Sequence, residues 1–183
     1  MEVRDRILGA ALNLLAQSGA QELTQPRVAR AAGVRQSHLT YYFPTRDELL
    51  QAVAYRSIDA LAVSLLHAAQ RGRLGPDALA RALARAITDK RRTRTLLALV
   101  GTADRDPAVR RRLSRFIREV RARLAFVIAT AEGPADPDSI AFLHNLVVGA
   151  AVLHLARDTS AARREARAVL RKGVAALAAR KGI

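Results

Sequence analysis

The sequence predicts an all-α protein of about nine helices. Apolar residues recur at helical spacing along the whole chain, and the sequence has neither the strict alternation of a strand nor an Asn-Gly or Asp-Gly hairpin signal. Ala, Leu, Arg and Glu, which all favour helices, dominate the composition. Glycine and proline interrupt this pattern and divide the chain into segments of ordinary helical length.

The helix boundaries follow from these breakers and from capping residues. Gly19 is expected to end the first helix, and Gly33 to separate the two short helices that follow. Thr45 is expected to cap a long fourth helix, and Pro76 to open the fifth. Residues 132–138, EGPADPD, are expected to form a turn. The predicted ranges are 3–17, 25–32, 36–42, 45–70, 76–89, 93–103, 107–131, 139–156 and 160–180.

Composition places the chain among folded, cytoplasmic proteins. Half of its 183 residues are apolar, which is enough for a sizeable core. The absence of cysteine excludes disulfides, thiolate metal sites and a cysteine nucleophile, and a reducing cytosol is the default compartment. The charged N-terminus makes a poor signal peptide. The longest apolar run, 140–156, falls short of the roughly 20 residues of a bilayer span, so we expect a buried helix and no membrane partner.

The charge of the chain indicates a polyanionic partner but does not identify one. The net charge is +15, and clustered Arg and Lys displace counterions from nucleic acid. However, only +3 of this charge belongs to residues 1–46, and the rest is spread along the remaining chain. All but three of the 31 basic residues are arginines in an Ala-rich sequence, which indicates a general compositional bias.

Residues 24–49 predict a helix-turn-helix. Thr24 is expected to cap the first short helix, and Gly33 to supply a turn with positive φ. Ala29 is small enough for the second helix to cross close to it, and Val34 and Leu39 are expected to anchor that second helix. A helix held in this way presents its polar surface to the major groove of DNA.

The candidate DNA contacts are polar or basic residues on and around this second helix. The basic residues among them are expected near phosphates, which position the protein without reading sequence. The alternative for the polar ones is an ordinary solvated helix face. Tyr42, although included, is also expected to pack with Phe43 as a wedge against the first and fourth helices. The candidates are Thr24, Gln25, Arg27, Arg35, Gln36, Ser37, His38, Thr40, Tyr41, Tyr42 and Arg46.

Residue by residue, this segment resembles the TetR family of transcriptional regulators. The matching elements are Gly19, Thr24, Ala32-Gly33-Val34, Leu39, Tyr42-Phe43 and Thr45-Arg46-Asp47-Glu48-Leu49. One departure is Thr40, where the family commonly has a phosphate-contacting Tyr. The resemblance implies a DNA-binding domain over 1–46 and a helical ligand-binding and dimerisation domain over 47–183. It further implies a homodimer, usually a repressor, that a small-molecule effector releases from a near-palindromic operator.

The C-terminal helices predict a dimer interface and an effector pocket. Helix 139–156 is apolar almost all round, and helix 160–180 carries a broad apolar stripe, so two copies could form a four-helix interface. The arginines of helix 107–131 have two interpretations, a solvated face or attraction for acidic ligands or DNA. The candidate pocket residues, chosen from apolar helix faces, are Leu66, His67, Leu97, Phe116, Val120, Phe142 and Asn145.

Two other classes of function remain as alternatives. The first is a basic helical protein that coats nucleic acid or anionic membrane without sequence preference, which would bind with a steep salt dependence. The second is an enzyme, for which the sequence offers no recognised constellation. His67, His144 and His154 lack metal-ligand spacing, and we expect no metal, no cofactor and no catalytic residue.

Overall fold

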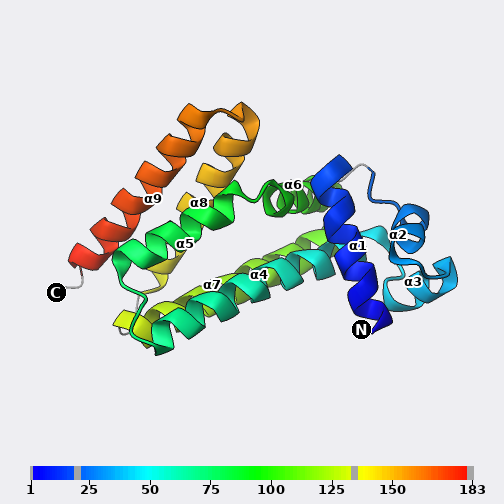
Figure 1. Cartoon of the computed structure of the whole chain (residues 1–183), viewed down its shortest axis with the longest axis horizontal. Helices are drawn as coiled ribbons and strands as arrows, with labels where there is room; N and C mark the ends of the chain where they lie inside the picture. The colour runs from blue at the N-terminus through cyan, green and yellow to red at the C-terminus, as the bar shows by residue number, and fades with distance from the viewer. Residues whose placement is uncertain (1, 19–21, 133–135, 181–183) are drawn as a thin grey trace. The chain divides into compact units, whose positions relative to one another are not determined.

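The computed structural model describes residues 2–18, 22–132 and 136–180, and all regular structure within them is helical (Figure 1). The predicted all-α class is therefore confirmed. Gly19 and part of the 132–138 turn lie outside the described residues. The helices are α1 (Val3–Ser18), α2 (Gln25–Ala32), α3 (Gln36–Tyr42), α4 (Arg46–Gln70), α5 (Pro76–Thr88), α6 (Lys90–Arg105), α7 (Pro107–Glu132), α8 (Pro137–Arg157) and α9 (Ser160–Arg180).

Two predicted helix starts are wrong because aspartate caps were overlooked. Helix α6 begins at Lys90 rather than at residue 93, and the Asp89 carboxylate accepts a hydrogen bond from the Arg91 amide at 3.1 Å. Helix α8 begins at Pro137 rather than at residue 139. Its cap is Asp136, which accepts from the Ser139 amide at 2.9 Å. The Ser139 hydroxyl and amide hold the pKa of Asp136 below its usual value.

Because α8 starts at Pro137, it is longer than the apolar run from which we expected no membrane span. Helix α8 has 21 residues and α4 has 25, and both are long and apolar enough to cross a bilayer by length and composition. The expectation that length alone excludes a span is therefore wrong. The core helix of a soluble protein passes the same test. In α8, residues Ile140, Leu143, Ala150 and Ala151 are buried against the rest of the fold.

The chain divides into two compact units. Unit 1 comprises the residues up to Ile58 together with Arg94–Phe116, and unit 2 comprises Asp59–Thr93 together with the residues from Ile117 onward. Helices α4, α6 and α7 therefore each contribute to both units. The predicted domain boundary after residue 46 stays a prediction.

Unit 1 has a core contributed by α1 to α4. Its buried residues include Ile7, Leu15, Leu23, Val28, Leu39, Leu49, Leu50 and Val53. Two contacts join α4 to α7 within this unit. Tyr55 lies edge-to-face on Phe116 with the ring centroids 4.7 Å apart, and Arg112 pairs with Glu48 at 3.4 Å.

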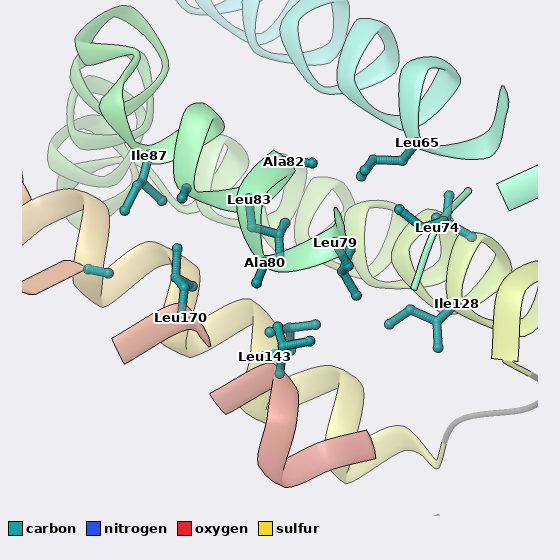
Figure 2. Packing of buried hydrophobic residues seen from close by; sticks show 14 of the residues in the cluster. Leu65, Leu74, Leu79, Ala80, Ala82, Leu83, Ile87, Ile128, Leu143 and Leu170 are labelled. Carbon is teal, nitrogen blue, oxygen red and sulfur yellow. The ribbon is translucent and has the colours of Figure 1, made fainter. Parts of the chain in front are cut away.

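Unit 2 is built around α5, which packs against both α8 and α9 (Figure 1). Figure 2 shows Leu83 of α5, Leu143 of α8 and Leu170 of α9 in one buried cluster. Helices α8 and α9 approach closely at Gly173, where a Cβ would collide with the Leu146 side chain. This close packing produces a paired α8–α9 layer.

Candidate nucleic-acid interface

The turn between α2 and α3 forms as the sequence predicts. Gly33 has φ 63° and ψ 39°, the left-handed conformation that glycine adopts most easily. The Gly33 amide donates to the Arg30 carbonyl at 3.1 Å, and the Val34 amide to the Ala29 carbonyl at 3.0 Å. These two bonds close the C-terminus of α2. Ala29 is buried, as its predicted position under α3 requires.

The predicted capping role of Thr24 is wrong. Thr24 occupies the N-cap position in an extended conformation, but its side chain makes no capping hydrogen bond. A cap side chain normally bonds the amide of the second or third helical residue, and here the second is Pro26, which has no N–H. At the next turn, by contrast, Thr45 caps as predicted, with its hydroxyl accepting from the Glu48 amide at 3.2 Å.

An arginine of α1 holds the turn in place. The Arg6 guanidinium donates from Nη2 to the carbonyls of Ala32 and Gly33 at 2.8 and 2.7 Å. A cation at the C-terminus of a helix also interacts favourably with the helix dipole. Sequence reasoning missed this residue. The contact joins positions 26 and 27 residues apart, and one arginine of α1 looks like any other in the sequence.

Gln25 and Arg46, two of the candidate DNA contacts, donate hydrogen bonds to main-chain carbonyls of distant residues. Gln25 donates from Nε2 to the carbonyls of Phe43 and Pro44 at 2.8 and 3.0 Å, which fixes the end of α3. Arg46 donates from Nε to the Leu23 carbonyl at 3.0 Å. Both side chains therefore support the helix-turn-helix, and their contact with DNA stays a prediction.

Helix α3 presents a polar face on a buried anchor. Leu39 is fully buried and Phe43, one turn later, is 4% exposed, with the Arg4 guanidinium 5.8 Å from the Phe43 ring centroid. The exposed residues at the start of and along α3 are Arg35, Gln36, Ser37, His38, Tyr41 and Tyr42. The helix thus offers hydrogen-bonding side chains to solvent while Leu39 and Phe43 hold it in the fold.

The predicted packing of Tyr42 differs from the structure, whereas the DNA contact of Thr40 stays a prediction. Tyr42 is 42% exposed and Tyr41 81%, and their rings meet edge-to-face at 5.3 Å. The predicted wedge is therefore Phe43 alone, because Phe43 shares the buried face with Leu39 at i+4 spacing. The Thr40 hydroxyl donates along its own helix to the carbonyls of residues 36 and 37, both at 3.1 Å.

The remaining DNA candidates lie at the starts of α2 and α3. Arg27 is exposed and pairs with Glu22, and Arg35 is exposed at the start of α3. Thr24 is exposed at the start of α2. The eleven candidates therefore all lie on or beside α2, α3 and the start of α4, within unit 1.

The predicted pocket residues fall in both units. Phe116 and Leu97 belong to unit 1, where Phe116 is buried and Leu97 is 41% exposed. Phe116 lines a small, mainly apolar cavity of that unit; the other lining residues are Asp47, Gln51, Leu99, Val109, Arg112 and Leu113. The other five lie in unit 2, where Leu66 and Val120 are half-buried and His67, Phe142 and Asn145 are exposed.

The histidines do not form a metal site in the described part of the chain, where no three His, Asp or Glu residues come together. His144 accepts a hydrogen bond at Nδ1 from Nε of Arg121 at 3.2 Å. Burial, together with the positive charge of Arg121, lowers the pKa of His144. His154 is buried, and neither of its ring nitrogens has a hydrogen-bond partner among the described residues.

Comparison with known families agrees with this geometry. Residues 7–53 match the model of bacterial regulatory proteins of the tetR family. Residues 73–178, more than half of the chain, match the model of the tetracyclin repressor-like C-terminal domain. The chain belongs to the TetR family. It is therefore a DNA-binding transcriptional regulator, as the resemblance of residues 19–49 implied.

Solved structures of TetR-family regulators share the whole fold. A member of the TetR family from Streptomyces coelicolor A3 is 26% identical, with 94% of this chain and 98% of that one covered and a TM-score of 0.69. The multidrug binding protein EbrR complexed with ethidium is 27% identical over 94% and 98% of the two chains, with a TM-score of 0.68.

A TetR transcription regulator from Haloarcula marismortui, 20% identical over 96% and 97% of the chains, has the same fold with a TM-score of 0.72. A search of curated proteins gave no match. The similarity of fold thus extends over both the α1–α3 segment and the later helices of this TetR-family chain.

Proposed function

We propose that the protein is a cytoplasmic, homodimeric repressor that reads a near-palindromic operator through α3 and is released by a small-molecule effector. The exposed polar face of α3, held on buried Leu39 and Phe43, carries this proposal. Gln36 and His38 are the side chains we assign to base contacts, because amide and imidazole groups pair with base edges in the major groove. Arg35 and Arg27 supply phosphate contacts.

The test is selection of bound sequences from a random duplex pool at physiological salt. Wild type is compared with the double variant Gln36→Ala/His38→Ala. A control is Ser64→Ala/Gln70→Ala, which removes two polar side chains from exposed positions of α4. We expect wild type and control to enrich the same inverted repeat, and the α3 variant to lose or alter it. Equal binding of every duplex by all three proteins would instead support nonspecific coating of nucleic acid.

The dimer would form through the α8–α9 layer. Phe142 and Leu153 on α8 are 48% and 57% exposed, and Val169 on α9 is 38% exposed. On α8, Phe142, Gly149 and Leu153 share one face at helical spacing, opposite the buried Leu143 stripe. A second copy applied to this face would complete a four-helix interface, with two α3 helices placed about 34–36 Å apart for successive major grooves.

Leu153→Glu tests this interface. A charge at the centre of a two-fold interface meets its own copy, so the variant is expected to sediment as a monomer at micromolar concentration. Val63→Glu is the control, because Val63 is also apolar and is 52% exposed on α4. The interface assignment is wrong if both variants remain dimeric.

The effector proposal rests on the fold and on one relative. EbrR, 25% and 27% identical in its complexes with imidazole and ethidium, is a multidrug binding protein. Release from DNA requires two states of the dimer, which differ in the spacing of the two α3 helices. The effector must bind the state that does not fit the operator more tightly than the state that does. A ligand screen against the selected operator, with loss of DNA binding as the signal, tests this step. Compounds that bind but leave operator affinity unchanged would contradict it.

A further inference from the structure

A polar cluster joins α7 to α8 in unit 2. The guanidinium of Arg121 donates from Nε to Nδ1 of His144 at 3.2 Å and from Nη2 to Oδ1 of Asn145 at 3.3 Å. Arg121 and His144 are half-buried, and Asn145 is exposed at the edge of the cluster. The guanidinium is therefore held in one orientation by two acceptors from the neighbouring helix.

Both of these acceptors are neutral. The carboxylates of Glu119 and Asp59 pair with Arg123, at 3.6 and 3.0 Å. Arg118, three residues before Arg121 on α7, is exposed and adds positive charge. A half-buried cation that is hydrogen-bonded to neutral groups has lost part of its hydration without gaining a counter-charge. This arrangement favours an anion at the cluster.

The geometry leaves one edge of the guanidinium for such an anion. A guanidinium has five N–H groups, and the Nε–H and one Nη2–H are directed at α8. The remaining edge, formed by Nη1 and Nη2, matches the two oxygens of a carboxylate. Because Nδ1 of His144 accepts from Arg121, the imidazole is neutral and carries its proton on Nε2.

We propose that Arg121 binds the carboxylate of an organic-acid effector, with His144 and Asn145 as positioning residues. The apolar body of the effector would lie along α8 beside Asn145, where Val148, one turn later, is half-buried. This inference rests on the proposed ligand response and names its ligand class. The proposed site selects against cationic ligands, because the positive charge of Arg121 repels them.

Binding of paired probes tests the proposal. Sodium octanoate and benzoate are compared with octanol and benzyl alcohol, which keep the apolar body without the charge, and acetate tests the charge alone. Isothermal titration is carried out on wild type, Arg121→Gln and the control Arg115→Gln, which removes an exposed arginine of α7. We expect wild type and control to bind at least one of the two longer carboxylates about tenfold more tightly than its alcohol, and Arg121→Gln to lose this preference.

Three outcomes overturn the assignment: neither carboxylate binds wild type, the carboxylate preference survives in Arg121→Gln, or acetate binds as tightly as octanoate and benzoate. If Arg121→Gln is unfolded by circular dichroism, Arg121→Lys takes its place, because it keeps the charge and loses the two-pronged edge. Ethidium is added to the DNA-release assay as a cationic probe. Release of the operator by ethidium or an alcohol, without carboxylate preference, would refute the Arg121 site while supporting the effector mechanism.

Discussion

Replacing Gly33 by alanine tests how the turn of the helix-turn-helix is stabilised. The structure offers a matched control in Gly72, which also has φ 63°. The backbone bonds are the same as well: the Gly72 amide donates to the Ala69 carbonyl and the Arg73 amide to the Ala68 carbonyl, both at 2.9 Å. The two glycines therefore share a backbone conformation and differ in their surroundings.

The difference lies in what a new Cβ would contact. At Gly72 nothing lies within 4 Å, so Gly72→Ala costs only the left-handed conformation, about 1–2 kcal/mol. At Gly33 the Cβ would lie 3.1 Å from Nη2 of Arg6, the atom that donates to the Ala32 and Gly33 carbonyls. Stretching these partly exposed bonds adds about 1 kcal/mol. We therefore expect Gly33→Ala to cost about 2–3 kcal/mol in total.

Urea denaturation, monitored by circular dichroism, measures the change in unfolding free energy for each variant. Repeating both substitutions in an Arg6→Ala background completes a double-mutant cycle. The extra loss of unfolding free energy in Gly33→Ala over Gly72→Ala should vanish when the Arg6 side chain is absent. An equal cost for the two alanine variants in the wild-type background would refute the expected disturbance of the Arg6 hydrogen bonds by the new Cβ. An excess that persists without Arg6 would place its origin elsewhere.

Three further predictions concern single side chains. Gln25→Glu should destabilise the protein by about 1–2 kcal/mol more than Gln25→Ala, because a carboxylate would face two carbonyls without a donor; equal unfolding free energies would refute this. Since the folded state lowers the pKa of His144, it takes up a proton less readily than the unfolded state, so unfolding free energy should fall as pH drops below about 6.5. His144→Gln should flatten that slope, and denaturation at pH 7.5 and 5.5 will show whether it does. Arg35→Ala should weaken binding to all duplexes alike and lower the salt slope by about one, measured by fluorescence anisotropy; a changed sequence preference would instead assign Arg35 to base readout.

Local signals explain what could be predicted from the sequence. The turn at Gly33, the anchor Leu39 and the cap Thr45 depend on residues within one or two helical turns, so their types and spacing were sufficient. Side chains that cross between elements were not predictable in the same way. Arg6 donates to a carbonyl 26 residues away, and the residues around Arg6 in the sequence give no indication of this contact.

The effector region shows the same limit. Phe142 and Asn145 were chosen from helix faces, but a helix face does not reveal which neighbouring helix covers it. The contact of Arg121 with His144 and Asn145 depends on the packing of α7 on α8, which the periodicity of either helix leaves undetermined. The predicted packing of Tyr42 is wrong for a related reason. The seven-residue helix α3 buries its Leu39 side and leaves Tyr42 exposed.

The polar side chains of Gln25 and Arg6, which hold the two ends of α3, donate only to main-chain carbonyls. Gln25 donates to carbonyls at the end of α3, and Arg6 donates to carbonyls at the turn that precedes it. Every residue type carries a carbonyl, so these supports place no demand on the identity of residues 35–38 and 41. The exposed side chains of α3 can therefore be replaced without loss of these hydrogen bonds. A descendant or a designed variant could acquire a new operator by substitutions on one face of α3, with the frame that holds the helix left unchanged.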